Sequence, residues 1–214
     1  MSSSIHASDS SSASRLIAGR LALDFANTAS ASHTLSWEDF ISFLASTNVV
    51  TFERAARLRS LLSSEPLAVK AVLPKILLLR ESYLAIFSAI ARKKPFSKAL
   101  VEPTNQILRI TEGHDELVQQ GEVWRLEYIA REQGLEWLLA AIARSAAELL
   151  VEGPDAPIRR CANPKCRLFF YDDSRTHRRR WCSMASCGNR HKVAAFFGRQ
   201  SKRSNILHRL PSPN

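Results

Sequence analysis

Residues 161–187 read CANPKCRLFFYDDSRTHRRRWCSMASC and contain all four cysteines of this 214-residue chain. Two close cysteine pairs joined by a medium loop suit a tetrahedral metal, because each pair can bind one edge of the coordination sphere. Four thiolates leave no open position for water, which favours a structural zinc over a catalytic one. We therefore expect one structural Zn²⁺, with two disulfides or four free thiols as the alternatives. Its ligands are Cys161, Cys166, Cys182 and Cys187.

The net charge of +10 is distributed unevenly along the chain. From Arg159 to the end there are 14 Lys/Arg and two acidic residues, whereas residues 1–158 carry 16 Lys/Arg and 18 acidic residues. A basic module of this kind indicates a polyanionic partner, most often nucleic acid. A basic surface that is merely solvated is the alternative, and no strongly amphipathic basic helix favours a membrane surface.

The rest of the chain predicts a mostly helical α+β fold. Apolar residues recur at helical spacing over several segments, and residues 122–130 alternate with the period of a strand, which we expect to be one arm of a small β-hairpin. Pro74 predicts a break or a new first turn within its helix, and Pro103 an interruption or restart. The expected helices span 36–44, 53–63, 67–92, 97–110 and 135–151.

These patterns divide the chain into a helical domain and a metal-binding module. We expect a short turn-rich linker between them, and we expect the module to dock against the last helix because the linker is brief. The predicted boundaries are a disordered Ser-rich tail at 1–14, a helical domain at 15–152, a linker at 153–158, a zinc finger at 159–200 and a basic flexible tail at 201–214.

The cysteine module itself predicts a treble-clef finger. The first cysteine pair forms a knuckle, residues 168–171 and 177–181 are expected to pair as a hairpin, and Ser183 is placed to cap a helix whose first turn carries Cys187. Trp181 and Phe169 are expected to pack around the zinc. His177 and His191 are less suitable ligands, because four cysteines already complete the site.

The run from Trp181 to Arg190, which includes Cys187-Gly188-Asn189-Arg190, resembles the CGNR zinc-finger family. The segment Leu21-Ala-Leu-Asp24-Phe25-Ala-Asn27-Thr28 is similar to the entry motif of the ABATE domain that usually precedes this finger. The resemblance covers roughly residues 15–200 and implies a bacterial transcription regulator induced by stress.

Basic residues around the metal site are the candidate nucleic-acid contacts, since arginine suits phosphate oxygens and guanine edges. Arg175 and Arg190 can instead bridge to Asp172 or Asp173 and hold the hairpin, and a structural role is also the alternative for the run Arg178–Arg180. The candidate set consists of Arg175, Arg178, Arg179, Arg180, Asn189, Arg190, Lys192 and Arg199.

We therefore predict a zinc-dependent, cytoplasmic DNA-binding regulator, with a zinc-scaffolded protein-interaction module as the alternative. Double-stranded DNA is the expected partner, and a homodimer would widen the small footprint of a single finger. No membrane partner is expected. The N-terminal domain has no P-loop, GxGxxG, GxSxG or HExxH motif, so we expect no enzyme. Asp24, Asn27 and Thr28 could line a pocket for a small-molecule effector or could simply cap local structure.

Overall fold

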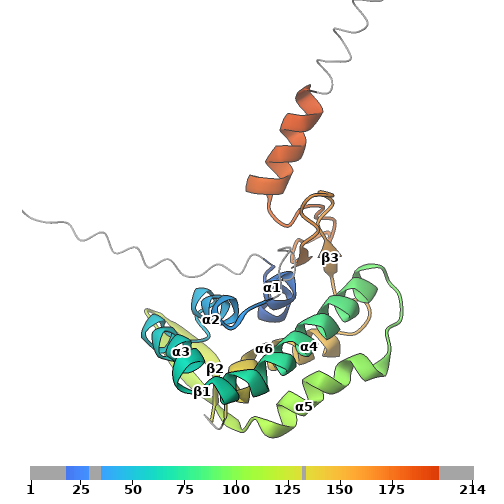
Figure 1. Cartoon of the computed structure of the whole chain (residues 1–214). Helices are drawn as coiled ribbons and strands as arrows, with labels where there is room; N and C mark the ends of the chain where they lie inside the picture. The colour runs from blue at the N-terminus through green and yellow to red at the C-terminus, as the bar shows by residue number, and fades with distance from the viewer. Residues whose placement is uncertain (1–17, 29–34, 132–133, 198–214) are drawn as a thin grey trace, which may run out of the picture.

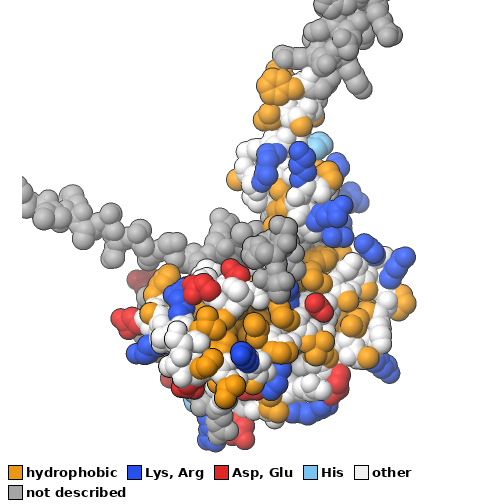
Figure 2. Space-filling model, in the orientation of Figure 1, with side chains coloured by type: hydrophobic (Ala, Val, Ile, Leu, Met, Phe, Trp, Pro, Cys, Tyr) orange, Lys and Arg blue, Asp and Glu red, His pale blue; other side chains and the backbone are white. Residues whose placement is uncertain are grey.

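The computed structural model describes residues 18–28, 35–131 and 134–197. The elements form a broad helical body from which the C-terminal finger projects as a narrow arm (Figures 1 and 2). The body contains the helices α1 (Leu21–Asn27), α2 (Trp37–Ser46), α3 (Phe52–Ser64), α4 (Pro66–Ala91), α5 (Glu102–Ile110) and α6 (Ala140–Val151), and the strands β1 (Gly113–Gln120) and β2 (Val123–Ala130). The fold class predicted from the sequence is thus confirmed.

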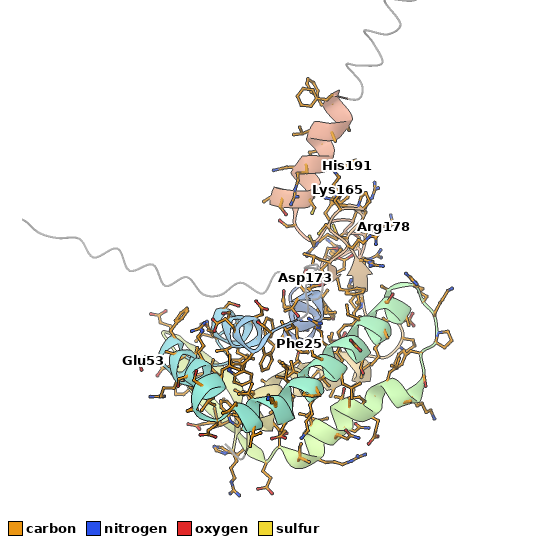
Figure 3. All side chains as sticks on the ribbon, viewed as in Figure 1. Phe25, Glu53, Lys165, Asp173, Arg178 and His191 are labelled. Carbon is orange, nitrogen blue, oxygen red and sulfur yellow. The ribbon has the colours of Figure 1, made fainter. Side chains whose placement is uncertain are left out.

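The core of the body forms around the long helix α4. Its Tyr83 and Phe87 rings are fully buried and contact each other, and Tyr83 meets Phe25 of α1 edge-on at 6.2 Å between ring centres. Phe25 points into the body, as Figure 3 shows. Thr104 of α5 donates its hydroxyl hydrogen to the Tyr83 oxygen, and burial raises the pKa of Tyr83. Aromatic packing therefore joins α1 to α4, and the Thr104 hydrogen bond joins α5 to the same core.

The predicted break at Pro74 is wrong, because α4 is continuous from Pro66 to Ala91. A proline inside a helix leaves the carbonyl four residues earlier without its usual partner. Pro74 is exposed, and so is Lys70, which carries that carbonyl. Water can therefore satisfy the carbonyl, and the strong apolar packing of the opposite face keeps the helix together.

Other predicted elements are confirmed with small changes at their ends. Ser36 caps α2 and exchanges hydrogen bonds with Asp39 in a capping box. The strand predicted at 122–130 is β2, which pairs antiparallel with β1. The segment 97–110 forms a 3₁₀ turn, η2 (Lys98–Val101), before α5, and the last body helix begins with a 3₁₀ turn, η3 (Glu136–Leu139).

The finger hairpin differs from the prediction. Strand β4 (Phe169–Tyr171) pairs antiparallel with β3 (Ile158–Arg160), which precedes the knuckle. Residues 177–181 were predicted to form the second strand but have no strand structure. His177 has φ 46°, and the backbone N–H of Arg179 turns inward to Asp172, so this segment cannot run as an extended edge.

The finger docks mainly on α1 and α4, and it meets the last helix, where docking was predicted, at the C-terminal end of that helix. Ile158 and Phe169 belong to the same buried core as the body, and Phe169 meets Phe87 of α4 edge-on at 6.4 Å. At the outer edge of β4 the backbone N–H of Tyr171 donates to the Ala18 carbonyl at 2.8 Å. At the end of α6, the Tyr171 hydroxyl donates to Glu152. The finger and the body therefore share one hydrophobic core.

Candidate zinc centre and basic surface

The four predicted cysteines converge on one point of the finger. Their sulfur atoms all lie within 4.8 Å of one another, with 3.6 Å between Cys166 and Cys182 and 3.8 Å between Cys182 and Cys187. A tetrahedral zinc with Zn–S bonds of about 2.3 Å requires sulfur–sulfur edges of about 3.8 Å. The donor set therefore fits one structural zinc held by four thiolates.

Asn163 organises the first half of the site. Its side-chain oxygen accepts from the Lys165 N–H at 3.0 Å, and its carbonyl accepts from the Cys166 N–H at 2.9 Å. The turn ends at Arg167, whose φ of 58° sends the chain back toward β4. The Asn163 amide also donates to the Cys187 sulfur at 3.5 Å. One knuckle residue thus shapes its own turn and contacts a ligand from the other cysteine pair.

The second half of the site is the start of the C-terminal helix. Ser183 caps it through the Ser186 N–H, a π-helical turn η4 (Met184–Gly188) carries Cys187, and an α-helix continues over residues 189–197. Burial opposes ionisation of Cys187, but the Asn163 amide and the neighbouring thiols lower its pKa to about 7. Burial raises the pKa of Cys182. The Cys187 thiol therefore ionises more readily than the Cys182 thiol, and zinc binding must displace the remaining thiol protons.

A small apolar shell surrounds the cysteines. Trp181 packs there as predicted, but the phenylalanine in the shell is Phe170, which is fully buried, and not Phe169. Neighbouring strand residues point to opposite faces, so Phe170 faces the metal site while Phe169 enters the body core. His191 packs on Trp181 at 4.7 Å between ring centres and is exposed. Within the described residues the metal-ligand cluster contains the four cysteines and no histidine.

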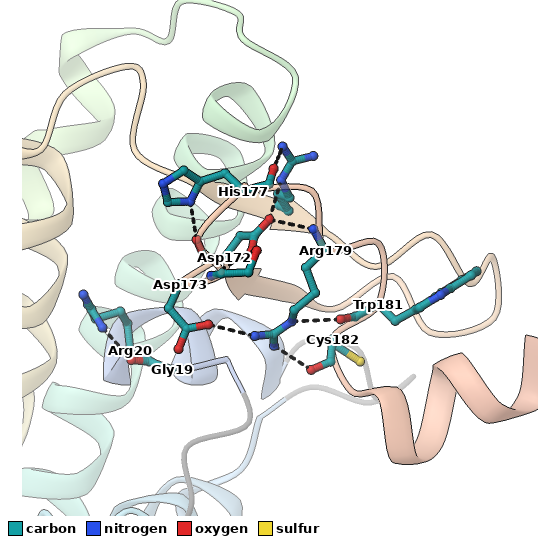
Figure 4. Close-up of polar contacts among 10 residues, drawn as sticks. Gly19, Arg20, Asp172, Asp173, His177, Arg179, Trp181 and Cys182 are labelled. Carbon is teal, nitrogen blue, oxygen red and sulfur yellow. Dashed lines mark hydrogen bonds and ion pairs between the residues drawn. The ribbon is translucent and has the colours of Figure 1, made fainter.

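Asp172 lies between the two cysteine pairs in the sequence, and its buried carboxylate binds several groups of the finger. It is fully buried and accepts from the Ser174 hydroxyl at 2.5 Å, from the Arg179 backbone N–H at 2.9 Å and from Arg159 at 3.0 Å (Figure 4). Burial alone would raise its pKa, but these hydrogen bonds and the charge of Arg159 hold the pKa below its usual value. Asp172 is therefore an ionised carboxylate that fixes the loop leading to Cys182.

The structure does not support Arg179 as a nucleic-acid contact. Its guanidinium donates to the carbonyls of Trp181 and Cys182 at 3.1 and 2.9 Å and to Asp173 at 3.1 Å, as Figure 4 shows. It also lies over the Phe170 ring at 4.7 Å. All three guanidinium nitrogens are used within the finger, so Arg179 stabilises the loop that carries the second cysteine pair.

The other predicted cations remain at the surface where the structure describes them. Asp172 and Asp173 pair with Arg159 and Arg179, and not with Arg175 or Arg190. Asn189 donates to the Ala185 carbonyl one turn back, at 3.3 Å. Arg199 lies outside the described residues. The exposed predicted cations are Arg175, Arg178, Arg180, Arg190 and Lys192.

Two further exposed cations lie on the knuckle and were missed in the sequence analysis. Lys165 and Arg167 are exposed and sit within and just after the first cysteine pair. Figure 3 shows Lys165, Arg178 and His191 on the finger, and Figure 2 shows Lys and Arg side chains gathered over this arm. The sequence feature that indicates them is the presence of two cations beside the CxxxxC pair.

The polar residues of the predicted pocket hold local structure. The Asp24 carboxylate accepts from the Ala18 N–H, and Thr28 donates to the Phe25 carbonyl at 2.7 Å. Asn27 donates to the Phe169 carbonyl at 2.9 Å and accepts from the Phe169 N–H at 2.8 Å. The capping alternative therefore accounts for these side chains, while an effector pocket at this place stays a prediction.

Two protein-family models match the two parts of the chain. A family model described as "Putative stress-induced transcription regulator" (ABATE) matches residues 19–153, which is more than half of the sequence. The chain belongs to the ABATE family. A model of the CGNR zinc finger matches residues 158–200, so the predicted family architecture is confirmed. No curated protein matches this ABATE chain. Its described helices include none with the length and apolar content needed to cross a membrane.

Proposed function

We propose that this zinc-binding member of a regulator family binds double-stranded DNA through the exposed cations of its finger and acts as a cytoplasmic transcription regulator. In this proposal the finger is a treble clef, the zinc shapes it, and the chain is not an enzyme. A homodimer would supply the longer footprint that specific binding of duplex DNA requires.

The distribution of charge within the finger carries the proposal. Residues 158–197 contain ten Lys/Arg and two acidic residues. Both acids are engaged inside the finger, Asp172 by Arg159 and Asp173 by Arg179. Cations such as Arg178, Arg180 and Lys165 consequently face solvent without a nearby carboxylate among the described residues. An uncompensated basic surface of this kind attracts phosphates.

Salt-dependent binding to a duplex of random sequence tests this proposal. The wild-type, zinc-loaded chain is titrated by fluorescence anisotropy at several salt concentrations. Each phosphate contact contributes about 0.9 to the slope of log affinity against log salt. The double variant R178Q/R180Q should therefore reduce the slope by up to about 1.8 if both arginines contact phosphates.

A matched control uses exposed arginines of the body. Replacing Arg57 of α3 and Arg109 of α5 with glutamine removes the same charge from the body, and should leave the slope unchanged. No measurable duplex binding by the wild type at low salt would reject the DNA proposal. An equal slope for R178Q/R180Q and the wild type would instead remove these two residues from the interface.

The alternative is a zinc-scaffolded module that binds another protein. The helix at 189–197 favours it, because Val193, Phe196 and Phe197 are at least half exposed on one side of this helix. Exposed apolar stripes mark protein contacts more often than phosphate contacts. A partner that binds wild type but not the variant F196S/F197S, with no duplex binding in either, would favour this alternative.

A further inference from the structure

The long helix α4 has a second apolar face that no described element covers. Its inner side supplies the core, yet Leu67 is 79% exposed and Leu78 is 51% exposed on the opposite side. Ala71 and Pro74 lie exposed between them, and positions 67, 71, 74 and 78 follow the spacing of one helical stripe. Figure 1 shows α4 at the front of the body, and Figure 2 shows hydrophobic side chains on this side.

Two unpaired charges flank this stripe. Lys70 and Glu81 are exposed, and neither has an ion-pair or hydrogen-bond partner in the described part of the chain. At about 100° per residue they fall on the same edge of the stripe, and they lie at equal distances from the midpoint between Lys75 and Ile76. On the other edge of the stripe Lys75 is paired with Glu136 of its own copy at 2.5 Å, so two Lys75 residues can meet near the crossing point. The remaining charges of this face are complementary to themselves when the helix direction is reversed.

We propose that this face of α4 binds the same face of a second copy, as an antiparallel helix pair crossing near Lys75. A two-fold axis through the crossing point places Lys70 of each copy opposite Glu81 of the other, so the ion pair forms twice. Short side chains at Ala71 and Pro74 let the two helices approach closely, and Leu78 of each copy lies level with the space between Ala71 and Pro74 of the other.

The size of the face sets the expected strength of the dimer. From Leu67 to Glu81 the stripe is about 21 Å long, and a helix is about 10 Å wide. Two such faces bury a total of several hundred Å², below the roughly 1,200–2,000 Å² of stable interfaces. The dimer should therefore be weak and reversible, and it does not depend on DNA binding.

Sedimentation velocity on the full zinc-loaded chain, over a hundredfold range of concentration and without DNA, tests the dimer. Wild type should shift reversibly from monomer to dimer. K70E or E81K places like charges opposite each other twice, and should weaken the dimer by about tenfold or more. L78D should weaken it further, while K98E, which changes an exposed lysine on η2, should have no effect.

A mixture of the K70E and E81K variants provides the decisive experiment. A K70E copy and an E81K copy bring glutamate opposite lysine at both positions, so the mixture should dimerise more tightly than either variant alone. The double variant K70E/E81K should likewise recover the wild-type association. Circular dichroism should match wild type for all these variants. The variants that carry E81K should unfold at a lower temperature, because they lose the negative charge beside the buried Arg80.

A wild-type chain that stays monomeric throughout would overturn the proposal and leave the face to a different protein. Dimerisation that L78D does not weaken, or a mixture no tighter than its components, would place the dimer contact elsewhere and also overturn it.

Discussion

The contact between Asn27 and Phe169 joins the finger to the body and predicts a large effect for a small substitution. Asn27 ends α1, and its amide pairs with both the N–H and the carbonyl of Phe169 at 2.8 and 2.9 Å. Phe169 is only 4% exposed, and its backbone groups lie at the edge of β4 that faces α1 rather than β3. The Asn27 side chain therefore satisfies the backbone N–H and carbonyl of Phe169 as a neighbouring strand would.

Asn27→Ala leaves two backbone groups of Phe169 without partners in a mostly buried place. Each buried unsatisfied group costs about 1–3 kcal/mol, and partial access of water reduces this, so the expected loss of unfolding free energy is about 2–4 kcal/mol. Asn27→Asp should behave differently, because its carboxylate still accepts from the N–H but repels the Phe169 carbonyl. Asn27→Gln keeps an amide but should also lose stability, because the longer side chain cannot reach both Phe169 backbone groups in the same geometry.

Urea unfolding followed by circular dichroism, together with zinc release to a chromogenic indicator, measures this effect. In the wild type, both signals should change together because the finger shares the body core. In Asn27→Ala, zinc should be released at lower urea than the loss of helix. Thr28→Ala is the matched control: its hydroxyl reaches only the Phe25 carbonyl, so the loss should be below about 1 kcal/mol. Equal, small losses for both variants would refute the reasoning.

Three further predictions concern the finger. A strong chelator should unfold it, because the clustered thiols lose the cation that holds them. The near-UV signal of Trp181 is obtained as the difference between wild type and Trp181→Phe, and its survival after complete metal removal would contradict a structural zinc. The pKa of Asp172 lies below its ordinary value, so its stabilisation is complete above the unfolded-state pKa and is lost as pH falls through the folded-state pKa. Asp172→Asn should remove this acid-side dependence from thermal unfolding curves, and an unchanged pH profile would argue against it. Arg179→Gln should lower the melting temperature, whereas Arg178→Gln should lower duplex affinity and leave the melting temperature unchanged; the opposite pattern would reverse their assigned roles.

The metal site could be predicted from the sequence because its information is local. The spacing of the cysteines limits the ways in which four sulfurs can meet, and the apolar shell follows from the aromatic residues beside them. The capping box at Ser36 was equally local, since both partners lie within one turn. Helices with clear periodicity were found for the same reason.

The remaining features depend on contacts between distant residues. β3 is only three residues long, and its strand character comes from pairing with β4 across the knuckle. The choice between Phe169 and Phe170 as the zinc-side ring depends on which face of β4 meets the body. Two adjacent acids in a basic segment gave no sign that Asp172 would be buried as a hub. Such arrangements follow from docking, which a single sequence does not reveal.

Docking of the finger on the body also connects the two proposals. Asn27 holds one edge of β4 and β3 holds the other, so the basic surface has a fixed orientation relative to α4. If two copies pair through α4, the two-fold axis relates their basic surfaces, and the DNA they prefer should contain inverted half-sites at one spacing. Sequences selected from a random pool by wild type at dimer-forming concentrations should show such repeats, whereas K70E should select single half-sites. Single half-sites from both proteins would mean that the finger reads DNA without help from the α4 pair.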